Sequence, residues 1–327
     1  MAQTAVRAML DEEHPELPAP ARAENAYILG SVGKHDVVIV CLPISQVGTV
    51  AVALTTASVT TTSRSLRFLL IVGTGGGVPL GPGDDIGSSS DVRLGGVVVG
   101  VPNGRLPGVV QCDTAEVLPG GGLGRDGALN MSNPSRFLLN RLAILQTEHE
   151  MKGTKIPEYL EAMATKWPRL RERYCKSGSL QDVLFEANYS HVTGPGPSWD
   201  GIDGRNAPPG CGYCDPRRMI EREPREMKIY YGLISSGSKV GKNAILRDNI
   251  NRQVLGGKVL CYEVETVGAA ALLNFPFLVI RGICDYCDSH SNRAWQRHAA
   301  AVAAAFAVEL LSHVPAVEVN RERSVWE

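Results

Sequence analysis

The sequence RFLLIVGTGGGVP, residues 67–79, decides the fold class. Arg67–Val72 is a nearly continuous apolar run without the alternation of a half-exposed strand, which is typical of a strand buried on both faces in a parallel or mixed sheet. The glycines from Gly73 onward let backbone N–H groups approach an anion or a sugar closely. The alternative for these glycines is a tight turn at the sheet edge.

Other stretches repeat this texture along the chain. Buried strands are expected at Gly96–Val101, Gly108–Gln111, Lys228–Ser235, Lys258–Glu263 and Pro276–Arg281. A hairpin is expected from Tyr27–Val32 and Asp36–Leu42, and helices from Ala5–Glu13, Val47–Thr62, Ser132–Glu150, Pro157–Arg173 and Ser291–Leu311. Buried strands that alternate with helices predict an α/β protein with three layers, α/β/α, around a central mixed sheet.

Polar and loop-forming residues interrupt this pattern in the middle of the chain. Thr193–Gly210, TGPGPSWDGIDGRNAPPG, consists almost entirely of residues typical of loops. We therefore expect a helical and loop insertion at residues 151–226. The first part of the core then spans residues 1–150, the second part spans 227–314, and 315–327 form a tail.

Composition excludes several classes of protein. Hydrophobic residues make up 44% of the 327 residues, and 33 basic residues balance 34 acidic ones, for a net charge of −1. This balance argues against a protein that coats nucleic acid or an anionic membrane. No apolar run reaches the roughly 18 residues of a membrane span, and no secretory signal is visible at the start. Eight scattered cysteines fit a reducing cytoplasm.

Charged side chains follow two of the expected strands. Glu263 and Glu265 are two residues apart, so they lie on one side of an extended chain, where a carboxylate can accept hydrogen bonds from vicinal hydroxyls. Arg281 and Asp285 come at the end of the next strand, the usual place for catalytic groups in an open α/β sheet. The structural alternatives are a solvated or salt-bridged edge for the glutamates and an Arg281–Asp285 ion pair.

Together these segments resemble the nucleoside phosphorylase superfamily, most closely the fungal branch fused to NACHT-type or ankyrin-bearing immune receptors. The blocks that carry the resemblance extend over nearly the whole chain: RAMLDEEH, AYILGSVGKHDVVIVCLP, VGTGGGVP, DVRLGG, EHEMKGTKIPEYLEAM, LISSG, CYEVET and VIRGICDYCDSHSNRAWQRHAAA. The resemblance implies cleavage of the N-glycosidic bond of a purine nucleoside or nucleotide, without cofactor or metal.

The resemblance also implies roles for individual residues. Asp285 would be the general acid that protonates N7 of the purine, Glu265 would bind the ribose hydroxyls, and Val264 would lie beside the sugar. The other implied positions are Gly73, Thr74 and Gly75 on the side of the nucleophile or phosphate, Ser236, Gly237, Val240 and Cys284 around the base, and Glu263 and Arg281 in support. General-acid catalysis of this kind contributes about 10²–10⁴-fold.

Two departures from the family pattern bear on the reaction. Bacterial hexameric phosphorylases carry an arginine where this chain has Ile71, which favours hydrolysis over phosphorolysis. Family members usually begin with a strand and an acidic residue, and by alignment that acid falls near Ala2, so both are expected to be missing and the remaining sheet edge to be exposed. Some relatives on immune receptors are thought to cleave ATP, so adenosine nucleotides are candidate substrates.

Several alternatives stay open from sequence. The domain could be a catalytically silent nucleoside-binding or scaffold module, or a phosphate-dependent phosphorylase. A homo-oligomer and a signalling-receptor context are further options, with the nucleoside or nucleotide as the small-molecule partner and with no nucleic acid or membrane partner.

Two other signals carry less weight in the sequence. The C-x-x-C pairs Cys211/Cys214 and Cys284/Cys287 are separated by about 70 residues, whereas paired zinc motifs are usually about 15–20 residues apart, so packing is favoured over a metal site, even with His290 nearby. A minority hypothesis has arginines of the insertion bind substrate phosphates; these are Arg217, Arg218, Arg222 and Arg225.

Overall fold

The computed structural model describes most of the chain. It covers residues 1–17, 25–46, 48–80, 91–104, 106–111, 116–117, 123–124, 134–178, 180–194, 207–237, 241–254, 256–264, 266 and 275–324.

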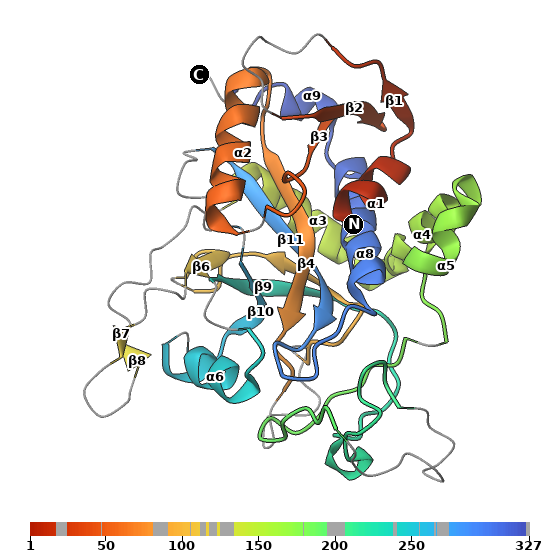
Figure 1. Cartoon of the computed structure of the whole chain (residues 1–327). Coiled ribbons are helices and arrows are strands. Elements are labelled where there is room, and N and C mark those ends of the chain that lie inside the picture. The colour runs from red at the N-terminus through yellow and green to blue at the C-terminus, as the bar shows by residue number, and fades with distance from the viewer. Residues whose placement is uncertain are drawn as a thin grey trace.

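A six-stranded mixed sheet forms the centre of the molecule (Figure 1). Its strands are β4 (Leu69–Gly77), β5 (Val97–Gly100), β6 (Val109–Gln111), β9 (Ile229–Ser236), β10 (Val259–Glu263) and β11 (Phe277–Asp285). Their order is β10-β4-β11-β5-β9-β6, and an additional pairing of β10 with β9 closes five of them into a ring. β4 runs parallel to β11, whereas β10 is antiparallel to β4 and β5 is antiparallel to β11. The predicted mixed sheet is therefore confirmed.

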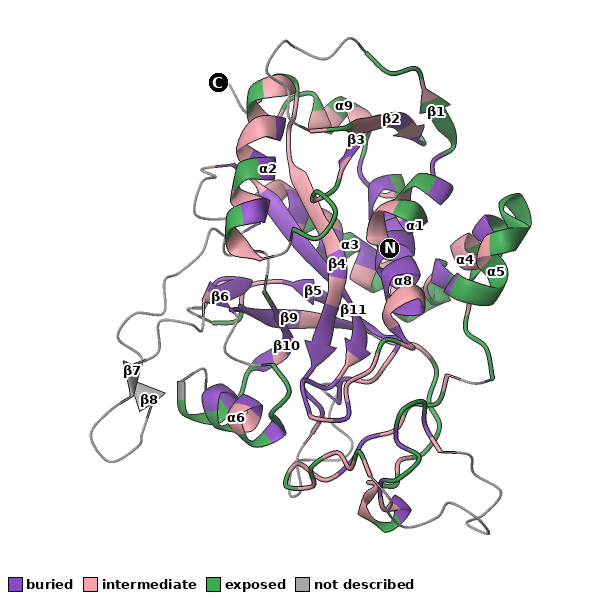
Figure 2. Cartoon of the chain, in the orientation of Figure 1, coloured by how far each residue is buried: buried purple, intermediate pink, exposed green. Residues whose placement is uncertain are grey.

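Helices cover both sides of this sheet, which confirms the three-layer prediction (Figure 1). α8 (Gln296–Ser312) packs on one face and contacts β4, β5 and β11, with further helices around it: α1 (Ala2–Ala8), α3 (Arg136–Lys152), α4 (Ile156–Lys166) and α5 (Pro168–Tyr174). On the other side, α2 (Thr49–Thr62) packs Val52 against the cluster that contains Ile71 and Phe275. Figure 2 shows that the strands and α8 are buried, while α4 and α5 expose much of their surface.

The N-terminal region differs from the predicted long helix. α1 ends at Ala8, and the chain then forms β1 (Glu12–His14), which pairs with β2 (Tyr27–Val32). The predicted hairpin is confirmed, because β2 also pairs with β3 (His35–Val40). The pairing of Glu12–His14 with β2 outweighs the helix propensity of these residues. Gly30 makes it feasible, since a Cβ at that position would lie 2.5 Å from the Glu12 carbonyl oxygen.

Several predicted boundaries also shift. The polar helix expected at Pro157–Arg173 is two helices, because Pro168 disfavours a helical conformation at Trp167. α3 begins at Arg136, where the Ser135 hydroxyl caps the Leu138 N–H at 3.2 Å; the predicted caps Ser132 and Asn133 lie outside the described residues. The closing helix begins at Gln296 rather than Ser291.

The remaining elements are short. They are β7 (Glu116–Val117), β8 (Leu123–Gly124), a 3₁₀ turn (Pro216–Arg218), α6 (Ala244–Asn249), a π-helical turn (Ile250–Val254) and α9 (Ala316–Val319). In the part of the chain that the structure describes, no helix combines the length and the hydrophobicity that a membrane span requires. On one side, the first half of β4 pairs with β11. On the other side, β4 pairs with β10, among the described residues only at Gly76 and Gly77.

α8 packs so closely on β11 that Gly282 has no room for a side chain. A Cβ at this position would overlap the carbonyl oxygen of Ala299, a backbone atom of the fully buried helix. We predict that Gly282→Ala lowers the free energy of unfolding by about 1–3 kcal/mol or more, because the helix must move away from the strand. Urea unfolding measures this change.

Gly178→Ala is the matched control, because a Cβ there meets nothing within 4 Å. We expect the control to change the free energy of unfolding by less than about 0.5 kcal/mol. Equal stability of the two variants would contradict the close packing of α8 on β11.

Candidate active site

The end of β11 lies directly beside the glycine run of β4. Arg281 pairs with Gly73, Gly282 with Thr74 and Ile283 with Gly75, and the register then shifts so that Asp285 pairs with Gly76. The irregularity falls at Cys284, the residue between the two registers. Asp285 is thus the last residue of the strand and is partly exposed at the carboxyl edge of β4 and β11.

The glycine run is a strand, so the turn considered from sequence is wrong. Gly73–Gly77 continue β4, and the absent side chains allow its neighbours to approach. A Cβ on Gly76 would lie 2.7 Å from Oδ1 of Asp285, and one on Gly75 would lie 2.5 Å from Sγ of Cys261 in β10. These glycines therefore let the carboxylate of Asp285 lie against the backbone of β4.

Two neighbours hold the carboxylate of Asp285. The N–H of Cys287 donates to Oδ1 at 2.9 Å, and Sγ of Cys284 lies 3.5 Å from Oδ2. Burial, and next the charge of Asp285, raises the pKa of the Cys284 thiol. The thiol therefore stays protonated, and its S–H is a weak donor toward Asp285 and the Gly75 carbonyl oxygen.

A buried ion pair lies next to this edge. Nη2 of Arg281 is 2.6 Å from Oε2 of Glu263, and each side chain is only 1% exposed. Thr266 completes the group, because its N–H donates to Glu263 at 3.0 Å and its hydroxyl accepts from Arg281 at 3.2 Å. The ion pair that the structure shows for Arg281 thus joins β11 to β10, whereas the sequence left an Arg281–Asp285 pair open.

The end of β9 reaches the same region. Ser236, the last residue of β9, is fully buried and pairs with Glu263, and the N–H of Gly237 donates to the Glu263 carbonyl oxygen at 2.8 Å. Val264, the residue after the end of β10, has 40% of its surface exposed. Glu265 and Val240, two further predicted site residues, lie outside the described residues.

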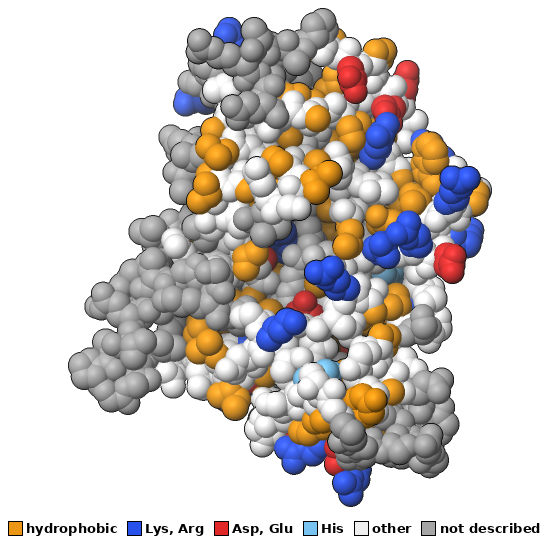
Figure 3. All heavy atoms as spheres, viewed as in Figure 1, with side chains coloured by type: hydrophobic (Ala, Val, Ile, Leu, Met, Phe, Trp, Pro, Cys, Tyr) orange, Lys and Arg blue, Asp and Glu red, His pale blue; other side chains and the backbone are white. Residues whose placement is uncertain are grey.

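Most predicted positions therefore converge on one region. The ends of four strands, β4, β9, β10 and β11, bring together Gly73, Thr74, Gly75, Ser236, Gly237, Glu263, Val264, Arg281, Cys284 and Asp285. Figure 3 shows a hollow over the carboxyl ends of β4 and β11, with acidic side-chain atoms on its floor and lysine or arginine side chains at its rim.

Comparison with solved structures places this arrangement in a known fold. Futalosine hydrolase of Helicobacter pylori superposes with a TM-score of 0.55 at 13% identity, over 95% of this chain and 93% of that chain. The chain has the fold of the nucleoside phosphorylase superfamily. The methylthioadenosine/S-adenosylhomocysteine nucleosidase of Neisseria meningitidis, in complex with methylthio-immucillin-A, gives a TM-score of 0.54 at 15% identity, over 95% of each chain.

A further nucleosidase of this fold and a curated relative complete the comparison. The enzyme from Colwellia psychrerythraea, in complex with adenine, has a TM-score of 0.53 at 16% identity, over 96% of this chain and 91% of that chain. A nucleotide-binding leucine-rich repeat (NLR)-like protein of the fungus Hyaloscypha variabilis is 37% identical over 314 residues. The match covers 94% of this chain but only 28% of that relative's length. No protein-family model matches the sequence.

The segment after Asp285 carries contacts that sequence reasoning missed. The hydroxyl of Tyr286 donates to Asp182 at 2.5 Å and accepts from Arg222 at 2.8 Å, and the Tyr286 carbonyl oxygen accepts from Nη1 of Arg247 at 2.5 Å. Nothing in the sequence pairs Tyr286 with residues 64 or 104 positions away. These bonds tie the end of β11 to α6 and to the segments that carry Asp182 and Arg222.

The arginines considered for phosphate binding have partners within the chain. Arg222 pairs with Asp182 at 2.9 Å, Arg217 with Asp215 at 2.9 Å and Arg218 with Glu186 at 2.6 Å. Arg225 donates to the hydroxyl of Tyr230. All four arginines therefore have contacts within the chain, and their role in phosphate binding stays a prediction.

A small cavity lies on the insertion side of Asp285. It has a volume of about 30 Å³ and is lined by Asp285, Asp288 and His290 together with Pro208 and Cys211. This volume suits water rather than a purine. The insertion thus forms part of the wall next to the candidate acid.

The buried Arg281–Glu263 pair should matter for stability. We predict that Glu263→Gln lowers the free energy of unfolding by about 3 kcal/mol, because the uncompensated guanidinium would remain in a desolvated site. The matched control is Glu161→Gln, which breaks the exposed pair with Arg171 and should change the free energy of unfolding far less, because water screens that pair. Chemical denaturation of both variants decides between them, and equal losses would contradict the structural role of the buried pair.

Proposed function

We propose that this domain hydrolyses the N-glycosidic bond of purine nucleosides or nucleotides and releases the base. The observation that carries the proposal is the place of Asp285, at the end of β11 and against the glycine run of β4, in a fold shared with purine nucleosidases. Structures of two such nucleosidases hold adenine and methylthio-immucillin-A, which supports a purine as the leaving group.

The proposed step protonates the leaving base. As the bond between the base and the anomeric carbon breaks, Asp285 gives a proton to N7 of the purine, and the sugar becomes oxocarbenium-like. The Cys287 N–H already occupies Oδ1 of Asp285, so Oδ2 is the oxygen that we assign to carry the proton. Glu265, which follows β10, is proposed to accept hydrogen bonds from the ribose hydroxyls. Water then adds to the anomeric carbon.

The surroundings of Ile71 favour water over phosphate as the nucleophile. Its side chain packs with Val52, Leu69 and Phe275 in an apolar cluster. This position, which is arginine in the bacterial hexameric phosphorylases that the sequence resembles, offers no donor to a phosphate. Hydrolysis is therefore preferred to phosphorolysis.

The biological setting is also a proposal. The curated relative is an NLR-like protein, so we infer that this domain acts within a fungal receptor of that kind, in the cytoplasm, with adenosine nucleotides such as ATP among its substrates. A catalytically silent nucleoside-binding module is the second candidate.

Asp285→Asn should abolish base release and leave the fold intact. The amide is nearly isosteric but cannot give up a proton, so we expect turnover to fall by about 10²-fold or more, with little change in melting temperature. Adenine release from adenosine, methylthioadenosine, AMP and ATP, with and without phosphate, measures this. Asp36→Asn, on the exposed side of β3, is the control.

Each outcome of this assay separates the candidates. Release by the wild type without phosphate, lost in Asp285→Asn, supports the hydrolase. A requirement for phosphate indicates the phosphorylase instead. Binding of nucleoside without release in either protein indicates the silent module, and unchanged turnover in Asp285→Asn refutes the assignment of Asp285.

Glu265→Ala should hurt ribosides far more than 2′-deoxyribosides. The substitution removes the proposed acceptor of the vicinal hydroxyls, and a site built to bind a hydroxyl discriminates strongly against substrates that lack it. The ratio of kcat/KM for adenosine to that for 2′-deoxyadenosine, measured in both proteins, tests the contact. If the ratio is the same in the variant, Glu265 does not bind the hydroxyls.

A further inference from the structure

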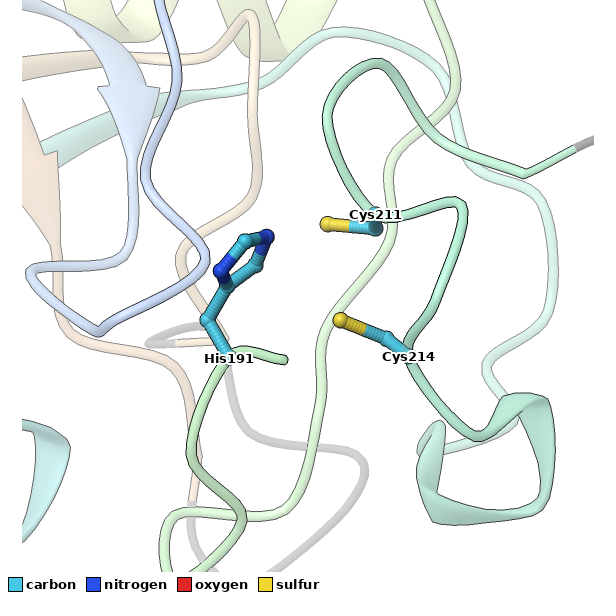
Figure 4. A group of neighbouring side chains, drawn as sticks. All are labelled: His191, Cys211 and Cys214. Atoms are coloured by element: carbon cyan, nitrogen blue, oxygen red, sulfur yellow. The ribbon is translucent and has the colours of Figure 1, made fainter. Parts of the chain in front are cut away.

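Three side chains between residues 191 and 214 come together beside the small cavity next to Asp285. His191, Cys211 and Cys214 lie so that one ring nitrogen and the two sulfur atoms are all within 4.8 Å of one another. Figure 4 shows that both thiols point toward the imidazole ring from a single turn. The cysteines are 2% and 0% exposed.

The backbone holds this arrangement in place. The Cys214 N–H donates to the Cys211 carbonyl oxygen at 3.0 Å, which closes the C-x-x-C segment into a turn and brings its two sulfurs to one side. Nε2 of His191 lies 2.8 Å from the carbonyl oxygen of Gly210, and the His191 N–H donates to Oγ of Ser289 at 2.9 Å. The ring is thus fixed between the turn and the loop that follows Asp285.

We propose that His191, Cys211 and Cys214 bind a structural zinc ion. Two thiolates and one imidazole are donors typical of zinc, and a C-x-x-C turn is a common way to present two of them. The two thiols lose their protons to solvent when the ion binds.

We assign the fourth position of the tetrahedron to His290, whose side chain would have to shift to reach the ion, because its ring nitrogens are not among the atoms that lie within 4.8 Å of one another. Its ring lies edge-on to that of His191, with 5.6 Å between centroids, and the residue is only 9% exposed. Among the described residues, Nε2 of His290 has no hydrogen-bond partner. A buried nitrogen without a partner is costly, and coordination of a metal would satisfy it.

The sequence did not predict this site, because the partner that it suggested for Cys211 and Cys214 was the second C-x-x-C pair. The second C-x-x-C pair has other roles: Cys284 lies against Asp285, and Cys287 packs in the cluster with Val78 and Tyr262. The third ligand, His191, precedes Cys211 across a long loop-forming stretch, so its spacing matches no familiar zinc motif.

The local packing explains why the insertion benefits from a metal. Among the described residues, the hydrophobic cluster around these cysteines has three buried members, Phe185, Cys211 and Cys214, and two of them are the proposed ligands. A core this small contributes little stability, and small lobes are often held together by a structural metal. Cys211 also lines the cavity next to Asp285, so the ion would fix that wall.

The test uses the full chain. We expect zinc to copurify at about one ion per chain by plasma mass spectrometry, and Co²⁺ added to the chelator-treated chain to give thiolate charge-transfer and tetrahedral d–d absorption. Cys211→Ser, Cys214→Ser and His191→Ala should each weaken Co²⁺ binding by about 100-fold or more, and His290→Ala by at least about 10-fold. Cys175→Ser, a half-buried thiol elsewhere, should change nothing.

The wild-type measurement keeps the proposal falsifiable if a variant fails to fold. Absence of zinc together with no cobalt spectrum in the wild type overturns the site, and so does a Cys211–Cys214 disulfide found by mass spectrometry of the chain purified without reductant. Retained binding in His290→Ala overturns the assignment of the fourth ligand. None of these results depends on base release, so the site and the proposed function fail separately.

Discussion

The close approach of β11 to its neighbours is the constraint on which the rest of the structure depends. On one face, Gly282 lets the backbone of α8 lie directly on the strand. At its edge, Gly76 lets the carboxylate of Asp285 lie against β4. A side chain at either place would push an element away by the width of a methyl group or more, and the interior of a protein does not yield easily to such changes. The alanines of α8 serve the same end, because Ala299–Ala305 are almost completely buried.

The Arg281–Glu263 pair has a different role in this arrangement. Burying two charges costs more free energy than their attraction alone returns, so such a pair contributes little to stability compared with apolar packing. It does fix geometry: the pair joins β11 to β10, and the Thr266 contacts hold the chain just after β10. The end of β11, which carries Asp285, and the end of β10, which precedes Glu265, are thereby held in a fixed position relative to each other.

The sequence predicted the positions of the six strands of the central sheet, but not where β4 and β11 end. Apolar runs such as Pro276–Arg281 located every strand of the central sheet, because burial on both faces leaves a clear signal. The same signal could not show that β4 and β11 continue through Gly77 and Asp285, since glycine and polar residues usually end a strand. Arg281 and Asp285 were singled out by their position at the end of a buried strand, and the resemblance implied the role of Asp285 as general acid. Tyr286 and His191 were not singled out, because their partners depend on how the insertion folds back, which no local pattern encodes.

Hydrogen bonds connect residues between 182 and 222 to the loop that follows the candidate acid, Asp285. The loop after Asp285 is held at Tyr286 by Asp182 and Arg222, and at Ser289 by the backbone N–H of His191. All three partners lie between residues 182 and 222, whereas Asp285 belongs to the central sheet. A change in the order of the insertion therefore reaches Asp285 through only a few residues of backbone, without passing through the sheet.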